Sequence, residues 1–184
     1  HLNIGQPDIE TPAAVLDAVR HSDFKVLEYS HSAGNESYRR KLVDYYASVG
    51  VHVNHNQIIV TTGGSEAILF GFMACLDPGD EVIIVDPAYD CYAPAVELFG
   101  GKPVHVCLGG GMQFDAEAVQ GAITPRTRML MINTPHNPAG TILRDADMQR
   151  IAALLHGTDI LLLSDEVYEH LVYDGEPHAS AINY

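Results

Sequence analysis

Five short apolar runs, separated by segments with helical spacing, restrict the fold of this chain more than any other feature. The runs lie at residues 58–62, 81–85, 103–107, 128–133 and 160–164. Strands that are apolar along their whole length are typical of a parallel sheet buried on both faces. The helices between them are predicted at residues 66–76, 93–99, 115–122 and 145–156. We therefore predict an α/β fold of three layers, α/β/α, around a mostly parallel sheet.

The part of the chain before the first predicted strand contains two more predicted helices, at residues 12–20 and 35–49. We expect residues 1–50 to form an N-terminal segment that leads into a large domain at residues 51–184. The chain does not begin with Met, and we expect it to be a segment of a longer protein.

Charge and composition exclude several classes of partner. The chain has 24 acidic against 10 basic residues, a net charge of −14, which disfavours nucleic acid and anionic membrane surfaces as partners. No apolar run approaches the roughly 18 residues that a membrane span needs, and the longest, residues 67–76, fits a buried helix. Cys75, Cys91 and Cys107 form no close motif, which favours a reducing cytoplasm over a disulfide scaffold. His52 and His55 have no cysteine nearby, and we predict no metal site.

The residues that follow the predicted strands are the candidates for function, because ligands of open α/β sheets bind beyond the carboxyl ends of the strands. Gly63, Gly64 and Ser65 join the first predicted strand to a helix. Glycine allows an anion to approach, and the free amides and dipole of the helix start favour phosphate. The loop matches neither the Walker A nor the dinucleotide pattern, so ATP and dinucleotides are not indicated. A plain tight turn is the alternative.

Three further loops carry polar or aromatic residues at the ends of predicted strands. Tyr89 is placed to stack on a flat ring, or else is a half-buried surface tyrosine. Asn137 lies in a loop with two prolines and can present an amide to a ligand hydroxyl, although a purely structural loop has the same residues. Asp165 is costly to bury unless it is paired, so it is expected to face a cation or a protonated nitrogen. Tyr168 would lie on the same side, and a helix N-cap is the alternative for Asp165.

In this order and at these spacings, the four loops resemble those of the class I/II aminotransferases, which are pyridoxal 5'-phosphate (PLP) enzymes of fold type I. The resemblance covers essentially the whole chain, beginning with Gly5-Gln6-Pro7-Asp8. It implies that Gly5 lies in the segment that lines the substrate carboxylate. It also implies a homodimer, in which Tyr29 reaches the cofactor phosphate of the neighbouring subunit.

The resemblance implies a cofactor-binding role for each of the loop residues. Gly64 and Ser65 would hold the cofactor phosphate, and Tyr89 would stack on the pyridine ring. Asn137 and Tyr168 would hydrogen-bond the phenolic oxygen of the ring. The catalytic residues would be Tyr168 and the aspartate at position 165, whose charge keeps the ring nitrogen protonated and makes the ring a better electron sink.

The most important departure from the family pattern is an absence. The Schiff-base lysine of the family follows the Asp165-x-x-Tyr168 motif by a few dozen residues, whereas this chain ends 16 residues after Tyr168. Lys25, Lys41 and Lys102 lie in no matching context. We therefore expect the lysine region and the C-terminal small domain to be absent and this segment alone to be inactive. In the family, further strands insert beside residues 58–62, so this strand would also lose its neighbour.

The resemblance implies PLP-dependent transamination of an amino acid with a 2-oxo acid. The later loops are similar to the branch that uses methionine, glutamine or kynurenine. The stretch before Val85 is closer to bacterial aspartate and aromatic members, so the sequence leaves the substrate open. A fold-type-I carbon–sulfur lyase shares the same cofactor residues. A truncated domain that binds PLP or only a partner chain, without catalysis, is the remaining alternative.

Overall fold

The computed structural model describes residues 8–184 and separates into two compact units, His1–Ser32 and Ala33–Tyr184. The first unit contains helix α1 (Ala13–Arg20), which begins one residue later than predicted, with Pro12 as its N-cap. In its last turn Arg20 pairs with Asp17 at 3.3 Å. The predicted domain boundary after residue 50 is not tested by this division and stays a prediction.

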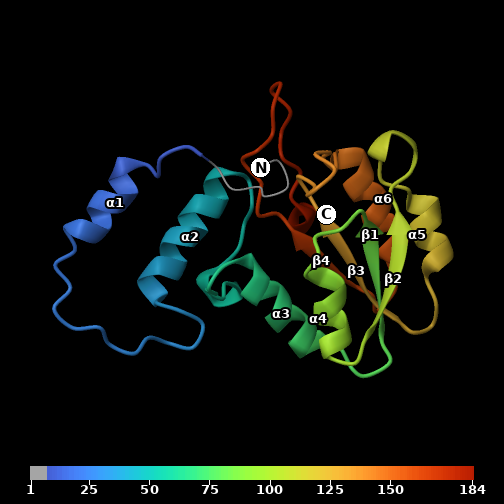
Figure 1. The fold of residues 1–184 in the computed structure, drawn as a ribbon, viewed down its shortest axis with the longest axis horizontal. Helices are drawn as coiled ribbons and strands as arrows, with labels where there is room; N and C mark the ends of the chain where they lie inside the picture. Colours follow the sequence, from blue (N-terminus) through green and yellow to red (C-terminus); the bar gives the residue numbers. More distant parts are fainter. Residues whose placement is uncertain (1–7) are drawn as a thin grey trace. The chain divides into compact units, whose positions relative to one another are not determined.

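The second unit is built on a sheet of four parallel strands (Figure 1). The strands are β1 (Glu81–Asp86), β2 (Lys102–Cys107), β3 (Thr127–Asn133) and β4 (Leu161–Asp165). Their order is β2-β1-β3-β4, and all three pairings are parallel. At the carboxyl edge, Asp86 lies opposite Cys107 and Asn133 lies opposite Asp165. The predicted parallel sheet is confirmed, and its polar residues meet at one edge.

Helices cover both faces of the sheet, which confirms the three predicted layers (Figure 1). On one face Val82 and Ile84 pack with α3 (Gly64–Cys75) and α4 (Tyr92–Leu98). On the other face Ile83 and Val85 pack with α5 (Ala116–Ala122) and α6 (Asp145–Leu155). Alternate residues of one strand point to opposite faces, so a continuous apolar run fills both cores.

Helix α2 (Glu36–Ser48) begins one residue after the predicted start, because Asn35 is its N-cap and the Asn35 side chain accepts a hydrogen bond from the backbone of Tyr38. Its Arg39 is buried and donates to the carbonyls of Gly34 (3.2 Å) and His55 (2.6 Å). These bonds fasten the helix to the segments on either side of it. Residues 8–184 also contain three short 3-10 helices: η1 (His55–Gln57), η2 (Gly110–Met112) and η3 (Ala181–Asn183).

The strand predicted at residues 58–62 does not form in this structure. The backbone at Ile58 is extended, with φ −110° and ψ 126°, but the segment pairs with no strand of the described residues. The Val60 amide donates instead to the Ala33 carbonyl at 3.0 Å. A groove of about 810 Å³ lies between this segment and β4, lined by Ile59 and Leu162 among others. The apolar pattern predicted extended backbone at Ile58 correctly, but a strand also needs a neighbour.

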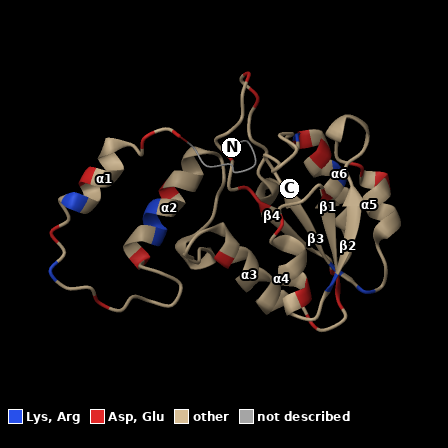
Figure 2. Ribbon diagram, viewed as in Figure 1, with Lys and Arg blue, Asp and Glu red and all other residues tan. Residues whose placement is uncertain are grey.

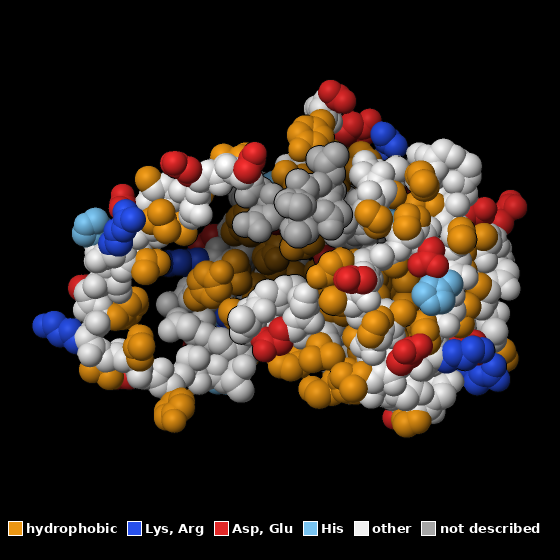
Figure 3. Space-filling model, viewed as in Figure 1, with side chains coloured by type: hydrophobic (Ala, Val, Ile, Leu, Met, Phe, Trp, Pro, Cys, Tyr) orange, Lys and Arg blue, Asp and Glu red, His pale blue; other side chains and the backbone are white. Residues whose placement is uncertain are grey.

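Helix α3 corrects a second expectation, that the apolar stretch at residues 67–76 is buried. Ile68 and Phe72 face the core, but Phe70 and Met73 are 42% and 56% exposed. Figure 3 shows apolar side chains gathered over α3 and α4 on the face in view. Without a polar face in the sequence, the pattern did not distinguish a buried helix from one that exposes an apolar side.

The amino-terminal edge of the sheet is held by a buried carboxylate. Glu81, the first residue of β1, is 2% exposed. It accepts hydrogen bonds from the Thr124 hydroxyl (2.5 Å) and the Arg126 guanidinium (2.8 Å), and Lys102 lies at 3.4 Å. These bonds, with Thr124 contributing most, lower the pKa of Glu81 to about 2. Figure 2 shows acidic and basic segments close together at this end of β1 and β2.

We predict that Glu81→Gln lowers the melting temperature of the full-length protein by several degrees at pH 7. The pKa of Glu81 lies below its ordinary value of 4.5, so its stabilising contribution is present above that pH and is lost as the pH falls towards about 2. The difference between variant and wild type should therefore shrink at pH 3, as measured by thermal unfolding. Glu117→Gln, which removes an exposed carboxylate from α5, is the control. A deficit that stays constant with pH would contradict this account.

Candidate functional site

A pocket of about 170 Å³ lies at the carboxyl edge of the sheet. Ten residues line it: Gly64, Ser65, Ile68, Tyr89, Tyr92, Asn133, Asn137, Asp165, Val167 and Tyr168. Six of these are predicted site residues, namely Gly64, Ser65, Tyr89, Asn137, Asp165 and Tyr168. Residues as far apart in the sequence as Gly64 and Tyr168, 104 positions, therefore meet at one place, because parallel strands bring their carboxyl ends to the same edge.

The start of α3 forms one wall of the pocket. Its N-cap is Gly63, which has a φ of +83° and no side chain with which to cap the amides of the first turn. A Cβ placed on Gly64 would meet no protein atom within 4 Å, so contacts inside the protein do not require glycine here. The bare backbone and the Ser65 hydroxyl leave room for an anion at a positive helix end.

Asp165 supplies a fixed, negatively charged carboxylate to the same pocket. Its Oδ2 accepts a hydrogen bond from the Tyr92 hydroxyl at 2.7 Å, and its Oδ1 accepts from the Val167 amide at 3.1 Å. Tyr92 is 2% exposed, and its burial, together with the bond to Asp165, raises the pKa of its phenol. The tyrosine is therefore a neutral donor to the carboxylate.

Asn133 is a residue of the pocket that sequence reasoning missed. The Asn133 side-chain NH2 donates to the backbone carbonyl of Asp165 at 2.8 Å. The Asn133 side-chain oxygen accepts from the backbone N–H of Asn137 at 2.7 Å. The backbone of Thr134 also donates to the Asp165 carbonyl, at 3.0 Å. Asn133 thus joins two loops of the site. A polar residue at the end of an apolar strand was the available signal, the same one that marked Asp165.

Tyr89 and Tyr92 pack edge to face, with ring centroids 5.7 Å apart and an interplanar angle of 72°. Hydrogen bonding with the Cys91 thiol is the main cause that raises the pKa of Tyr89. The buried ring of Tyr92 therefore supports the more exposed ring of Tyr89 at the pocket.

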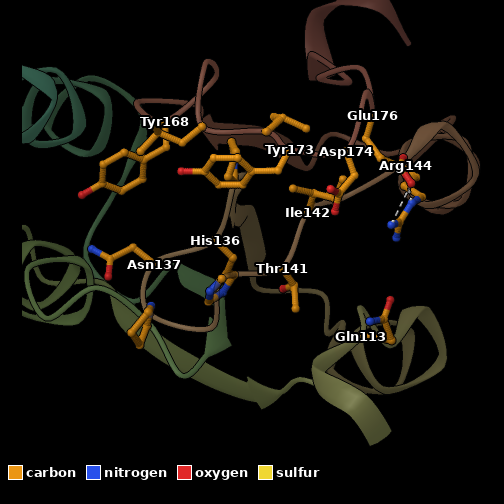
Figure 4. A pocket seen from close by; sticks show the side chains of 15 residues that line it. Gln113, His136, Asn137, Thr141, Ile142, Arg144, Tyr168, Tyr173, Asp174 and Glu176 are labelled. Atoms are coloured by element: carbon orange, nitrogen blue, oxygen red, sulfur yellow. Dashed lines mark hydrogen bonds and ion pairs between the residues drawn. The ribbon is translucent and has the colours of Figure 1, made fainter.

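A larger cavity of about 570 Å³ adjoins the pocket and shares Asn137 and Tyr168 with it. Figure 4 shows Tyr168 and Tyr173 on one side of this cavity and Asn137 and His136 on the other, with the Arg144–Glu176 ion pair at its far end. Burial lowers the pKa of His136, so its imidazole is neutral at pH 7. This cavity, lined by both apolar and polar side chains, borders the smaller pocket.

Two predicted residues are not placed at the pocket. Gly5 lies outside the described residues, and Tyr29 belongs to the first unit, so the role of each stays a prediction. In residues 8–184 no three His, Cys, Asp or Glu side chains gather as a metal site, and no helix is long and apolar enough to cross a bilayer.

Comparison with known proteins identifies the family. The family model described as aminotransferase class I and II matches residues 1–183. The chain belongs to this family. Class I and II aminotransferases are PLP enzymes, as the resemblance of the four loops implied.

Individual aminotransferases agree with this assignment. A probable N-acetyl-LL-diaminopimelate aminotransferase of Bacillus subtilis is 39% identical over 188 residues, which cover 100% of this chain and 47% of that protein. Human kynurenine–oxoglutarate transaminase 1 is 33% identical, with 97% of this chain and 47% of that one covered. The crystal structure of an aromatic aminotransferase from Pyrococcus horikoshii superposes with a TM-score of 0.93 at 34% identity, over 98% of this chain and 50% of that one. The chain therefore spans about half the length of the relatives it matches.

Proposed function

We propose that the protein containing these 184 residues binds PLP in the pocket at the carboxyl edge and transfers an amino group between an amino acid and a 2-oxo acid. The observation that carries this proposal is the presence, in one pocket, of a free helix start and a fixed carboxylate. PLP has a group to match each of these features: a dianionic phosphate for the helix start and a basic ring nitrogen for the carboxylate.

The residues of the pocket fit the cofactor group by group. Gly64 and Ser65 would hold the phosphate through amides and a hydroxyl. Tyr89 would stack on the ring, and Asn137 and Tyr168 would hydrogen-bond its phenolic oxygen. All five line the same pocket, and each supplies the donor or the flat surface that its partner group needs.

The residues of this chain would bind the cofactor and polarise its ring, and they would not transfer atoms themselves. When bound, PLP supplies an electron-withdrawing ring that stabilises negative charge on the α-carbon of the substrate. Asp165 would hold a proton on the ring nitrogen, because its negative charge favours the protonated form. Tyr168 would donate a hydrogen bond to the phenolic oxygen and so stabilise the negative charge on that atom.

Binding of PLP to the full-length apoenzyme, followed by absorbance, tests the cofactor site. Ser65→Ala should weaken binding about tenfold, because one hydrogen bond to a charged group is lost. Ser48→Ala is the matched control, since the Ser48 hydroxyl is exposed and donates to the Tyr45 carbonyl at 2.6 Å on α2. An affinity for PLP equal in Ser65→Ala and wild type would contradict the assignment.

The reaction is tested by offering aspartate, methionine and kynurenine with a 2-oxo acid and identifying the products. Formation of a new amino acid and a new 2-oxo acid supports transamination. Release of ammonia and a thiol from a sulfur-containing substrate, without amino transfer, would assign the carbon–sulfur lyase activity instead.

The proposed enzyme is a cytoplasmic homodimer. The basis for the dimer is Tyr29, whose counterpart in the family serves the neighbouring subunit, and the basis for the location is the cysteine pattern. Sedimentation of the full-length protein measures its oligomeric state, and a fully active monomer would contradict the shared site.

A further inference from the structure

We propose that Tyr92 is a positioning residue for Asp165, whose carboxylate it orients towards the cofactor nitrogen without neutralising its charge. This inference rests on the proposed PLP-binding function. It concerns a residue that sequence reasoning did not single out and that reaches the cofactor only through Asp165.

The position of Tyr92 is set by the core. It is the first residue of α4, and its ring belongs to the buried cluster that includes Phe72 and Val96, both 0% exposed. A ring packed in this way has a single place for its hydroxyl, and that hydroxyl donates to Oδ2 of Asp165 at 2.7 Å. The hydroxyl is therefore a fixed point against which the carboxylate is held.

The rest of Asp165 is held as well. The Val167 amide donates to Oδ1 of Asp165, and the backbone carbonyl of Asp165 accepts hydrogen bonds from Asn133 and Thr134. Rotation of the carboxylate would break the bonds to Tyr92 and Val167 together. Each oxygen of a carboxylate has about two acceptor sites, so one bond to each oxygen leaves sites free for a donor in the pocket.

The hydrogen-bond donors to the Asp165 carboxylate, a phenol and a backbone amide, are both neutral. Among residues 8–184, no lysine, arginine or histidine forms a salt bridge with Asp165. A cationic partner would fix the carboxylate but would also cancel the charge that a protonated ring nitrogen needs. A phenol donates a hydrogen bond, favours the ionised carboxylate and leaves the net negative charge available.

The test uses full-length holoenzyme with Tyr92→Phe, which removes the hydroxyl and keeps the ring. The first readout is the nitrogen-15 NMR signal of PLP labelled at the ring nitrogen, and the second is the dissociation constant for PLP. We expect the signal to move towards that of the unprotonated nitrogen and the affinity to fall about tenfold. The control is Tyr184→Phe, which removes a bond of the same kind, 2.5 Å long, between Tyr184 and Asp145 of α6. It should change neither readout.

Replacing Tyr92 with 4-aminophenylalanine keeps a donor at the same point and should restore the wild-type nitrogen signal. If Tyr92→Phe does not fold, 3,5-difluorotyrosine at position 92 keeps the ring and hydroxyl with a stronger donor, and the signal should then move the opposite way. A nitrogen signal that is unchanged in the folded variants would overturn the proposal and leave Tyr92 as a core residue. A wild-type protein that does not bind PLP would instead refute the proposed function itself.

Discussion

Replacing Asp165 with alanine in the full-length enzyme is expected to lower turnover by about 10²–10³-fold, the range seen when one group that stabilises a transition-state charge is removed. The physical reason is that the carboxylate favours the protonated ring nitrogen, which matters most when negative charge develops on the substrate. The proposed phosphate contacts at Gly64 and Ser65 would remain, so PLP binding should fall much less than turnover. Single-turnover rates and PLP titrations on the same preparation measure the two effects separately.

The matched control is Asp159→Ala, which removes an exposed carboxylate from the loop before β4. It should leave turnover and PLP affinity unchanged. Near-normal turnover in Asp165→Ala would contradict the role assigned to this residue, and equal losses of turnover and phosphate anchoring would indicate a structural role only.

A polypeptide of just these 184 residues is expected to show no transamination. The reaction requires a primary amine that holds the cofactor and moves a proton between two carbons. No lysine lines the pocket in the described residues. Lys102 begins β2 and pairs with Glu81 at 3.4 Å, at the opposite end of the sheet from Asp165, and Lys41 lies exposed on α2.

Borohydride reduction of this polypeptide with PLP, followed by mass spectrometry of its peptides, measures whether any lysine binds the cofactor covalently. We expect no stoichiometric adduct, while full-length protein treated in parallel gives one and so confirms that the reagent works. A single complete adduct on Lys25, Lys41 or Lys102, with measurable amino transfer, would contradict this prediction.

Most element positions were predictable, because local patterns determine them. Strands β1 to β4 and helices α1 to α6 lie within two residues of the predicted ranges. The exception is residues 58–62, where β-branched residues favour extended backbone but pairing depends on a neighbour that may lie anywhere along a chain. The local pattern of apolar residues in one segment contains no information about the strand that will pair with it.

The candidate site was likewise predictable from the sequence only in part. The identities of Gly64, Tyr89, Asn137 and Asp165 at the ends of predicted strands were sufficient to predict one pocket, since parallel strands end together. The bonds among the neighbours of these residues were not predictable. The contacts of Asn133 with Asp165 and Asn137 depend on the register of β3 against β4.

By itself, the sequence determined the α/β architecture, the edge of the sheet at which the pocket lies and the residue types presented there, because periodicity and strand-end position are local properties. Only the tertiary structure decided that residues 58–62 join no strand of residues 8–184, that α3 exposes part of its apolar surface and that Tyr92 holds Asp165. Tyr92 and Asp165 are 73 residues apart in sequence, and their hydrogen bond exists because the packing of α4 against the sheet brings a phenol within 2.7 Å of a carboxylate. Such a contact depends on the packing of whole elements, which no local pattern encodes.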